Sequence, residues 1–416
     1  MGDDKMKILN FGSCNIDYVY YLDHIVRDGE TETTYKLEVF PGGKGLNQSI
    51  AAAKAGVQIY HAGCVGFDSN LLTDILSENG VDISYLRKIP EKNGHAVIQV
   101  SNKGENSIFL SPGSNEMVSE DYIDAVLENF DSDDIILLQN EISNVDYIVE
   151  KAYQKNMRII LNPSPFNERI DKIDFNKLTY VILNEIEVKE ISGCSVLEEG
   201  LMYIRNRYSN LKVMLTLGSK GCIYTDNQCE LYQPAFEVKA VDTTAAGDTF
   251  TGYFVAELLR GTQYSEILKI ASAAAAVAVS RKGAAPSIPD KCEVLSSLEN
   301  LKENQSNKKS DFIHGQIKTY IEQNIKTANL EELSAILGYS AVYTGSLVKK
   351  LTGKSFSKEV QEKRCSIAAR KLLETDLSIE EIIADVGYEN ESFFRKIFKE
   401  KYGKNPLEYR KRGVRE

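Results

Sequence analysis

The feature that most constrains the fold is an alternation of short apolar runs with helical patterns over most of the chain. Runs such as KILNFG, IYHAGCVG, DIILLQN, RIILNPS, YVILNE and VMLTLG are each followed by a stretch with helical periodicity. This spacing predicts βαβ units, and therefore an α/β fold with a mostly parallel sheet between two layers of helices. Two stretches, at roughly 16–40 and 94–110, break the pattern and are expected to add strands that form a small β lid.

Polar residues end four of these apolar runs. The carboxyl ends of parallel strands meet at one edge of a sheet, where ligands bind in α/β proteins. We therefore expect one crevice to collect the segments Gln139–Glu141, Asn162–Ser164, Asn184–Glu187 and Thr216–Gly218.

The composition of the chain changes near residue 290. The segment SLENLKENQSNKKSD (297–311) is polar and is interpreted as a linker between a domain at 1–296 and one at 312–416. The second region is all-helical and repeats itself, because LEELSAILGY (330–339) recurs as IEEIIADVGY (379–388). Helix, glycine turn and helix is the helix-turn-helix pattern. Ser340 is expected to cap one helix, and Ser378 with Glu381 to form a capping box.

Composition narrows the class of protein. With 416 residues, the chain is too long for a single ordinary core. Its seven cysteines form no CxxC pair, which indicates reduced thiols and argues against metal ligation by cysteine. No apolar run is long enough to cross a bilayer, and the acidic N-terminus does not read as a signal peptide, so a cytoplasmic location without membrane contact is expected.

The charge is distributed unevenly. Residues 311–416 carry 19 Lys and Arg against 16 Asp and Glu, a balance of +3, whereas the rest of the chain carries −14 of the total of −11. A solvated helical face would explain the basic end, and so would a polyanionic partner of the C-terminal region alone.

The stretch DTTAAGDTF (242–250) combines small residues with a carboxylate. If a helix begins here, the N–H groups of Ala245, Ala246, Gly247 and Asp248 are free to bind an anion, and small side chains let it approach. The arrangement would suit a transferring phosphoryl group, with Asp248 as the general base that accepts a hydroxyl proton. An ordinary capped helix would explain the same residues.

A second motif decides between these interpretations. PGGKGLNQSIAAAKAG (41–56) is a glycine-rich turn that opens an alanine-rich helix, and it lacks the spacing of a Walker-type loop. With both motifs in this order, residues 6–290 resemble the ribokinase (phosphofructokinase B-type) family of sugar kinases. The resemblance implies a ribokinase-like three-layer fold with a β lid, and ATP-dependent phosphorylation of a pentose, with ribose favoured.

The resemblance also implies roles for individual residues. Asp248 would be the catalytic base, beside an anion hole formed by Ala245, Ala246 and Gly247. The sugar would be bound by Asn15, Asp17, Gly43, Lys44, Asn47, Glu141 and Asp248. The nucleotide would be bound by Asn184, Glu187, Thr216, Gly218, Ser219, Gly221 and Gly247. Potassium would be bound, mostly through backbone carbonyls, by Asp242, Thr244, Ala278, Arg281, Gly283 and Ser287.

The implied cofactors are ATP, magnesium and potassium, with Glu187 acting on magnesium indirectly, and a homodimer is expected. Two residues depart from the family pattern. Leu46 stands where an Ala is usual, and Ser49 replaces another small apolar residue. Both were expected to neighbour the sugar, which leaves its identity open.

The helical region, from about 317 to 412, resembles the AraC-type regulators, whose DNA-binding unit is two helix-turn-helix motifs joined by a long helix. It ends on the pattern GYENESFFRKIFKEKYGKNPLEYRK (387–411). The resemblance implies that residues 312–416 bind double-stranded DNA, with recognition helices near 341–350 and 391–401. The contacting residues would be Val342, Ser346, Lys349, Ser392, Arg395, Lys396 and Lys399. The second helix is expected to read more of the sequence.

Three hypotheses fit these observations. The chain is an active sugar kinase that also binds an operator, a regulator whose kinase-like domain only senses sugar or nucleotide, or a kinase with a decayed C-terminal region. A pure sensor needs no general base, and a decayed region would not keep the apolar positions and basic ends of both repeats. We therefore favour the first hypothesis.

Overall fold

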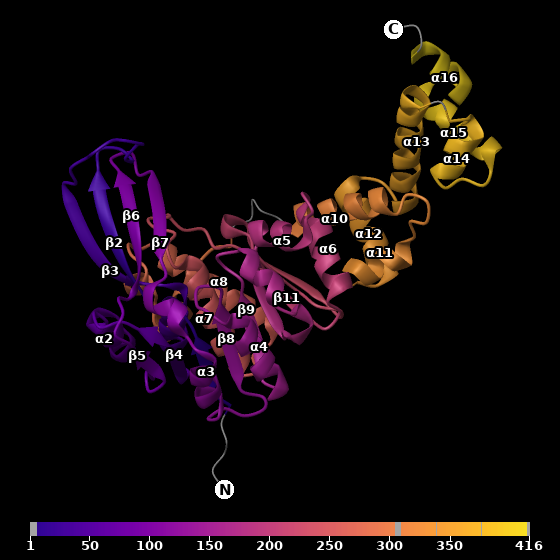
Figure 1. Ribbon diagram of the computed structural model, residues 1–416. Coiled ribbons are helices and arrows are strands. Elements are labelled where there is room, and N and C mark those ends of the chain that lie inside the picture. The colour runs from indigo at the N-terminus through magenta and orange to yellow at the C-terminus, as the bar shows by residue number, and fades with distance from the viewer. Residues whose placement is uncertain (1–5, 304–308, 338, 376, 414–416) are drawn as a thin grey trace. The chain divides into compact units, whose positions relative to one another are not determined.

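The computed structural model describes residues 6–303, 309–337, 339–375 and 377–413 (Figure 1). The chain divides into two compact units, residues 1–306 and 307–416, and the division falls inside the segment interpreted as a linker. Residues up to 303 contact the first unit, since Glu237 donates its N–H to the carbonyl of Lys302 and Phe236 bridges to Glu303. The linker limits of 297 and 311 remain a proposal, and Gly338 of the first turn lies outside the described residues.

The first unit is built on a nine-stranded mixed sheet (Figure 1). Neighbouring strands are parallel except at one edge, where β12 and β13 are antiparallel to their neighbours. The spatial order is β13 (Glu230–Pro234), β12 (Gly221–Thr225), β11 (Lys212–Thr216), β10 (Tyr180–Asn184), β9 (Arg158–Asn162), β8 (Ile135–Gln139), β1 (Ile8–Phe11), β4 (Ile59–Val65) and β5 (Leu86–Lys88).

Both faces of this sheet are buried, as parallel sheets require. In β8, Ile135 and Leu137 belong to a core shared with α1, α2, α7, α8 and α9, while Ile136 and Leu138 are equally buried on the opposite face. The first layer contains α1 (Lys44–Lys54), α2 (Asn70–Glu78), α7 (Ala246–Leu259), α8 (Tyr264–Val279) and α9 (Lys291–Leu298). The second contains α3 (Glu120–Leu127), α4 (Val145–Gln154), α5 (Glu185–Ser192) and α6 (Leu197–Arg207).

The two stretches that break the alternation form a separate four-stranded sheet, which confirms the predicted lid (Figure 1). Its order is β3 (Lys36–Gly42), β2 (Asn15–Leu22), β6 (Gly94–Ser101) and β7 (Asn106–Ser111). Because β2 begins four residues after β1 ends and β3 runs directly into α1, the lid is rooted where the central sheet presents its carboxyl ends.

Helices α1 and α7 carry the two sequence motifs and pack closely. A Cβ atom added at Gly252 of α7 would lie 2.4 Å from the Cβ of Ala51 and 2.7 Å from the backbone nitrogen of Ala52 on α1. Small residues are therefore required along this contact. The close approach brings the first turn of α1 against the first turn of α7.

The second unit contains seven helices among the residues described. They are α10 (Lys309–Gln323), α11 (Leu330–Leu337), α12 (Ala341–Thr352), α13 (Phe356–Glu374), α14 (Ile379–Asp385), α15 (Glu391–Tyr402) and α16 (Pro406–Gly413). Two small cores form, one by α10–α12 with the start of α13 and one by the rest of α13 with α14 and α15. Helix α13, roughly 28 Å long for 19 residues, is shared by both.

The predicted helix starts are confirmed. Ser340 accepts the N–H of Tyr343 at the start of α12, and Ser378 with Glu381 forms the capping box of α14. Helices α12 and α15 both end at a glycine with left-handed backbone, at φ 78° for Gly353 and 72° for Gly403. The repeat seen in the sequence is thus a repeat of two helix-turn-helix motifs.

Arg364 of α13 ties the two motifs together. Its guanidinium donates to the carbonyls of Ile325 (2.8 Å) and Lys326 (2.8 Å) before the first motif, and to that of Gly387 (2.9 Å) in the turn of the second. Asp385 pairs with Lys326 at 2.7 Å across the same junction. These bonds fix the spacing of the motifs within the second unit. No helix in the described residues is long and apolar enough to cross a membrane.

Candidate active site

The site lies where the strand order of the sheet reverses. Strand β1 has β4 on one side and β8 on the other, so the connections that leave β1 and β8 diverge around one crevice. Parallel register also aligns the ends of the next strands, since Gln139 pairs with Asn162 and Asn184 pairs with Thr216. The expected gathering of polar strand ends is confirmed.

Helix α7 begins within DTTAAGDTF. Ala245 adopts left-handed backbone at φ 58° and precedes the first turn, and the space that a side chain of Gly247 would fill is open. Of the four N–H groups predicted to be free, that of Ala246 donates to the carbonyl of Thr243 at 3.3 Å. Those of Gly247 and Asp248 have no partner among the described residues, and they are left for an anion.

Asp248 is buried, with 8% of its surface exposed, and two amides hold its carboxylate. Asn47 Nδ2 donates to Oδ2 at 3.0 Å, and Gln48 Nε2 donates to Oδ1 at 3.0 Å. Both amides come from the first turn of α1. The carboxylate therefore has a fixed position at the open end of α7.

Glu141 lies on the other side of the crevice. Its carboxylate accepts the hydroxyl of Ser13 and the backbone N–H of Lys44 (2.9 Å). Burial raises the pKa of Glu141, although the charge of Lys44 opposes this. Burial would also lower the pKa of Lys44, but the carboxylates of Asp248, Glu141 and Glu187 outweigh it and the pKa is raised. The ammonium group therefore stays charged at the meeting point of three carboxylates.

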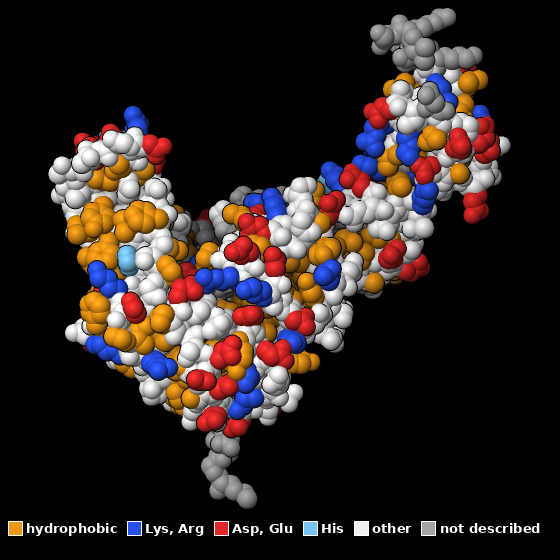
Figure 2. All heavy atoms as spheres, in the orientation of Figure 1, with side chains coloured by type: hydrophobic (Ala, Val, Ile, Leu, Met, Phe, Trp, Pro, Cys, Tyr) orange, Lys and Arg blue, Asp and Glu red, His pale blue; other side chains and the backbone are white. Residues whose placement is uncertain are grey.

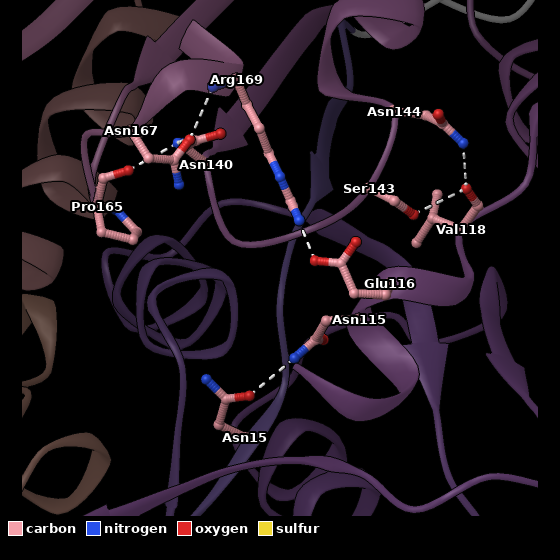
Figure 3. A network of polar contacts seen from close by, with 10 residues as sticks. All are labelled: Asn15, Asn115, Glu116, Val118, Asn140, Ser143, Asn144, Pro165, Asn167 and Arg169. Carbon is pink, nitrogen blue, oxygen red and sulfur yellow. Dashed lines mark hydrogen bonds and ion pairs between the residues drawn. The ribbon is translucent and has the colours of Figure 1, made fainter. Parts of the chain in front are cut away.

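The start of the lid contributes Asn15 and Asp17. Asn15 is buried, and its Oδ1 accepts from Asn115 Nδ2 at 2.8 Å, as Figure 3 shows. Burial, followed by repulsion from Glu141, raises the pKa of Asp17 from its ordinary 3.8 to about 7. Gly43 has left-handed backbone at φ 97°, and an added Cβ would lie 3.0 Å from the nitrogen of Asn15. The glycine loop thus passes directly over these side chains.

The wall of a cavity of about 230 Å³ includes Asn140 and Ile142, the residues on either side of Glu141 in the sequence. Arg169 pairs with Glu116 at 2.7 Å on this wall. Asn140 donates to the carbonyl of Pro165 (2.7 Å) and to Asn167 (3.1 Å). These bonds brace the loop that carries Glu141.

The NEIE segment forms the start of α5. Asn184 accepts the N–H groups of Ile186 and Glu187, and Glu187 accepts the N–H of Asn184 at 2.9 Å, a reciprocal capping box. Its residues thus have a structural role that the sequence did not reveal. Burial raises the pKa of Glu187 despite the bond from Asn184 and the charge of Lys44.

The predicted nucleotide loop follows β11. Thr216 donates its hydroxyl to the carbonyl of Leu183 at 3.2 Å. Gly218 (φ 55°) faces open space, and Ser219 lies between it and Lys220 in a short 3-10 turn. Packing alone explains why residue 221 is a glycine, because an added Cβ would lie 2.1 Å from the carbonyl oxygen of Gln233.

Three of the residues predicted to bind potassium, Asp242, Thr244 and Gly283, are in direct contact. Asp242 accepts the N–H (2.9 Å) and hydroxyl (2.7 Å) of Thr244 and the N–H of Gly283 (3.0 Å). Burial raises the pKa of Asp242, but these bonds outweigh it and keep the pKa below the ordinary value. The carbonyl of Ala278 accepts the backbone N–H of Arg281 at 3.0 Å. The guanidinium of Arg281 forms an ion pair with Glu293. The Ser287 hydroxyl donates to the carbonyl of Ala284.

The side chains of Leu46 and Ser49 are buried in the first unit, and that they neighbour the sugar stays a prediction. Leu46 is fully buried in the hydrophobic core. Ser49 is fully buried and bonds to Asn10 (2.8 Å) and to His61 (2.8 Å) beneath the helix. A helix that packs on a sheet buries these positions whatever its other face binds.

Two residues near Asp248, Gln48 and Gln139, were not assigned a role from the sequence. Gln48 contacts the carboxylate directly, and Gln139 donates to Gln48 Oε1 at 2.7 Å. Gln48 follows Asn47 in the glycine motif, and Gln139 is the polar end of the buried run IILLQ. Both stood in stretches already singled out, but only the packing of α1 on the sheet shows that they touch.

In the second unit, α12 and α15 present matching exposed rows. Residues spaced by four and three positions share one helix face. Val342, Ser346 and Lys349 are exposed on α12, and Ser392, Lys396 and Lys399 are exposed on α15. Val342, the first residue of the row on α12, has 83% of its surface exposed.

Arg395 differs from the other predicted DNA contacts. Its guanidinium pairs with Glu380 of α14 at 2.9 Å and with Glu391 at 3.4 Å. It lies beside the exposed row of α15 and braces α14 against α15.

Comparison with known proteins agrees with this geometry. Residues 5–291 match the pfkB family of carbohydrate kinases, and residues 333–412 match a helix-turn-helix domain. The chain is 33% identical over 297 residues to a ribokinase from Haemophilus influenzae, covering 69% of this chain and 97% of that one. It is 30% identical to a deoxyribokinase from Salmonella typhi, with 68% and 96% covered.

Among solved structures, Arabidopsis thaliana ribokinase complexed with ribose and ATP superposes with a TM-score of 0.64 at 28% identity, over 71% of this chain and 99% of that one. The fold and the site define an α/β sugar kinase joined to a helix-turn-helix unit. This chain belongs to the pfkB family of carbohydrate kinases, and its kinase region is ribokinase-like. The C-terminal match bears out the AraC-type assignment of the helical region.

Proposed function

We propose that the protein phosphorylates a pentose, with D-ribose favoured, at its primary hydroxyl, and binds DNA through its second unit. The observation that carries the kinase half is the buried carboxylate of Asp248, held by two amides. Beside it, the N–H groups of Gly247 and Asp248 have no partner in the described part of the chain. A pure sensor of sugar has no use for this pairing of a base with an anion hole.

The sugar is expected between α1 and the lid. Asn47 is buried, and because its Nδ2 donates to Asp248, its Oδ1 is left without a partner among the described residues. A buried carbonyl oxygen without a donor is costly, and a sugar hydroxyl would supply one. Asn15, Asp17 and Glu141 add further acceptors. Such a polar inventory suits a small polyol, and sites of this kind discriminate by hydrogen bonding.

The chemistry follows from these positions. Asp248 accepts the proton of the primary hydroxyl while the hydroxyl oxygen attacks the γ-phosphorus of ATP, and the bond to the ADP oxygen breaks. The N–H groups at the start of α7 meet the negative charge of the transferring phosphoryl group. Lys44, charged among three carboxylates, adds a cation near the same point.

Two metal ions fit the donor chemistry. Magnesium prefers oxygen ligands and retains water. The Glu187 carboxylate already accepts from the N–H of Asn184 and from Ser164, so it would hold magnesium through water. The Asp242 carboxylate and the carbonyls of the 278–287 turn are oxygen donors for potassium. An ion there would stiffen the Asp242–Asp248 loop that forms the anion hole.

DNA binding is supported by the two exposed rows on α12 and α15 and by the spacing that Arg364 fixes. In this class of motif, recognition helices enter successive turns of the major groove on one side of the duplex. Lys349, Lys396 and Lys399 would contact phosphates or bases. Arg395 would have to leave its two glutamates to do so.

A homodimer through the lid is also proposed. Figure 2 shows hydrophobic side chains gathered on the visible face of the lid. Its strands expose large apolar residues at fractions of 44–57%. By the strand register, Leu37, Val39 and Phe109 share one face, and Ile108 and Leu110 lie on the other. An apolar patch on a small sheet is typical of a protein interface.

A panel of ribose, 2-deoxyribose, fructose and nucleosides, with ATP, magnesium and potassium, would test the kinase half by ADP release. We expect the highest kcat/KM with ribose. Faster turnover of fructose or a nucleoside would contradict the pentose assignment and leave the family assignment intact. The DNA half is tested by fluorescence anisotropy on the protein's own upstream DNA, with and without ribose and ATP.

Specific binding that changes with sugar or nucleotide supports a coupled regulator. Equal affinity in all conditions would mean two independent activities. No binding at low salt would contradict the DNA assignment.

A further inference from the structure

A series of buried amides leads from the core of the first unit to Asp248. Asn10 at the third position of β1, Gln139 at the end of β8 and Gln48 on α1 are all fully buried. Asn10 and Gln139 come from neighbouring parallel strands beneath α1, and neither contacts Asp248 directly among the described hydrogen bonds. Their contacts nevertheless determine which end of Gln48 meets the carboxylate.

The order of donors and acceptors starts at a backbone carbonyl. Asn10 Nδ2 donates to the carbonyl oxygen of Gly45 at 2.8 Å. A carbonyl accepts and cannot donate, so the nitrogen end of Asn10 must face it and the oxygen end must face away. That oxygen accepts from Gln139 Nε2 at 3.0 Å.

The same polarity is passed on to Gln48. The second hydrogen of Gln139 Nε2 goes to Gln48 Oε1 at 2.7 Å. With its oxygen end occupied, Gln48 turns its nitrogen end to Asp248 Oδ1 (3.0 Å) and to Asn162 Oδ1 (3.3 Å). The reverse orientation would place amide oxygens opposite one another and opposite the carboxylate, and buried polar groups do not tolerate such contacts.

We infer that Asn10 and Gln139 are positioning residues for the phosphoryl transfer, because they keep Gln48 oriented as a hydrogen-bond donor to the catalytic base. This inference rests on the role proposed for Asp248. A donor holds the carboxylate in place and stabilises its charged form, which is the form that accepts the hydroxyl proton. With the acceptor end of Gln48 turned inward, the two oxygens would repel each other and the carboxylate would be displaced.

Ser49 provides a control within the same network. Its hydroxyl accepts from Asn10 Nδ2 at 2.8 Å, a side branch that leaves the bond to the Gly45 carbonyl intact. Ser49→Ala therefore removes two buried hydrogen bonds, to Asn10 and to His61, without changing the polarity of the series. We expect its kcat to match that of the wild type.

The test uses the full-length protein with ribose, ATP, magnesium and potassium. Gln139→Met and Gln48→Met each remove the oriented donor at nearly constant volume. Each should lower kcat roughly ten- to a hundredfold, the range for a hydrogen bond to a charged group, and change KM for ribose far less.

The double variant separates positioning from a structural effect. If Gln139 acts through Gln48, the double variant will lose no more than Gln48→Met alone. Multiplication of the two losses, or a wild-type kcat for Gln139→Met, would overturn the inference. Should Gln139→Met fail to fold, Gln139→Leu also removes the donor with an apolar side chain of similar size, with the same expectations.

Asp248→Asn distinguishes the inference from its premise. Retention of kcat in that variant would overturn the role of Asp248 and the inference with it. Loss of kcat in Asp248→Asn, together with wild-type behaviour of both Gln139 variants, would overturn the inference alone.

Discussion

Replacing Asp17 by Asn should stabilise the protein without ligand and weaken its binding of sugar. Burial and the neighbouring Glu141 raise the pKa of Asp17 from 3.8 to about 7. Folding therefore disfavours the charged form of this side chain. The penalty is absent below about pH 4, when Asp17 is protonated in both states, grows up to about pH 7, and stays constant above.

The size of the penalty follows from the two pKa values. A shift of roughly 3 units at about 1.4 kcal/mol each amounts to at most about 4 kcal/mol above pH 7. The free energy of unfolding of Asp17→Asn, minus that of the wild type, should therefore rise by about 1.4 kcal/mol per pH unit between pH 4 and 7 and then level off. Sugar affinity should fall roughly ten- to a hundredfold, because a charged acceptor is lost.

Urea unfolding of both proteins at pH 5, 6, 7 and 8, without sugar, measures this difference, and titration calorimetry with ribose measures the affinity. Asp74→Asn, which removes an exposed carboxylate on α2, is the control. A difference that is independent of pH, or that shrinks as the pH rises, would refute the argument from burial. Unchanged ribose affinity would remove Asp17 from the sugar site.

Four further results are expected. Asp248→Asn should lower kcat by about 10²–10⁴-fold and leave ribose binding in place, as stopped-flow and calorimetry would show. Replacing potassium with sodium or choline should lower kcat, and Asp242→Asn should abolish that difference. Lys396→Ala should weaken DNA binding and reduce its salt dependence, measured by anisotropy at several salt concentrations. Arg364→Met should cost more than tenfold in affinity for a two-site operator, with little change for DNA containing one half-site.

Elements with a strong periodic pattern were predictable from the sequence. The apolar runs became β8, β9, β10 and β11, and the repeat became two helix-turn-helix motifs with the expected caps at Ser340 and Ser378. Periodicity and capping depend on residues close together in the chain, so a single sequence contains the information. The lid was found for the same reason, as two stretches that interrupt the alternation.

Individual side-chain partners were harder to predict. Asn184 and Glu187 were assigned to ligands, yet their first bonds are to each other's backbone at the start of α5. Arg395 was assigned to DNA, yet two glutamates hold it. A motif restricts residue types, but several contacts satisfy the same chemistry, and long-range packing selects among them.

The amides beneath α1 show this limit most clearly. Gln48 and Asp248 are 200 positions apart, and Gln139 is 91 positions from Gln48. The donor that faces Asp248 is determined by the Gly45 carbonyl through Asn10 and Gln139, none of which belongs to the DTTAAGDTF motif. An amide has no orientation in a sequence, because oxygen and nitrogen exchange places by rotation of one bond. Its orientation is settled only when every neighbour is in place, so the base depends on a network in which each member looks like an ordinary buried polar residue.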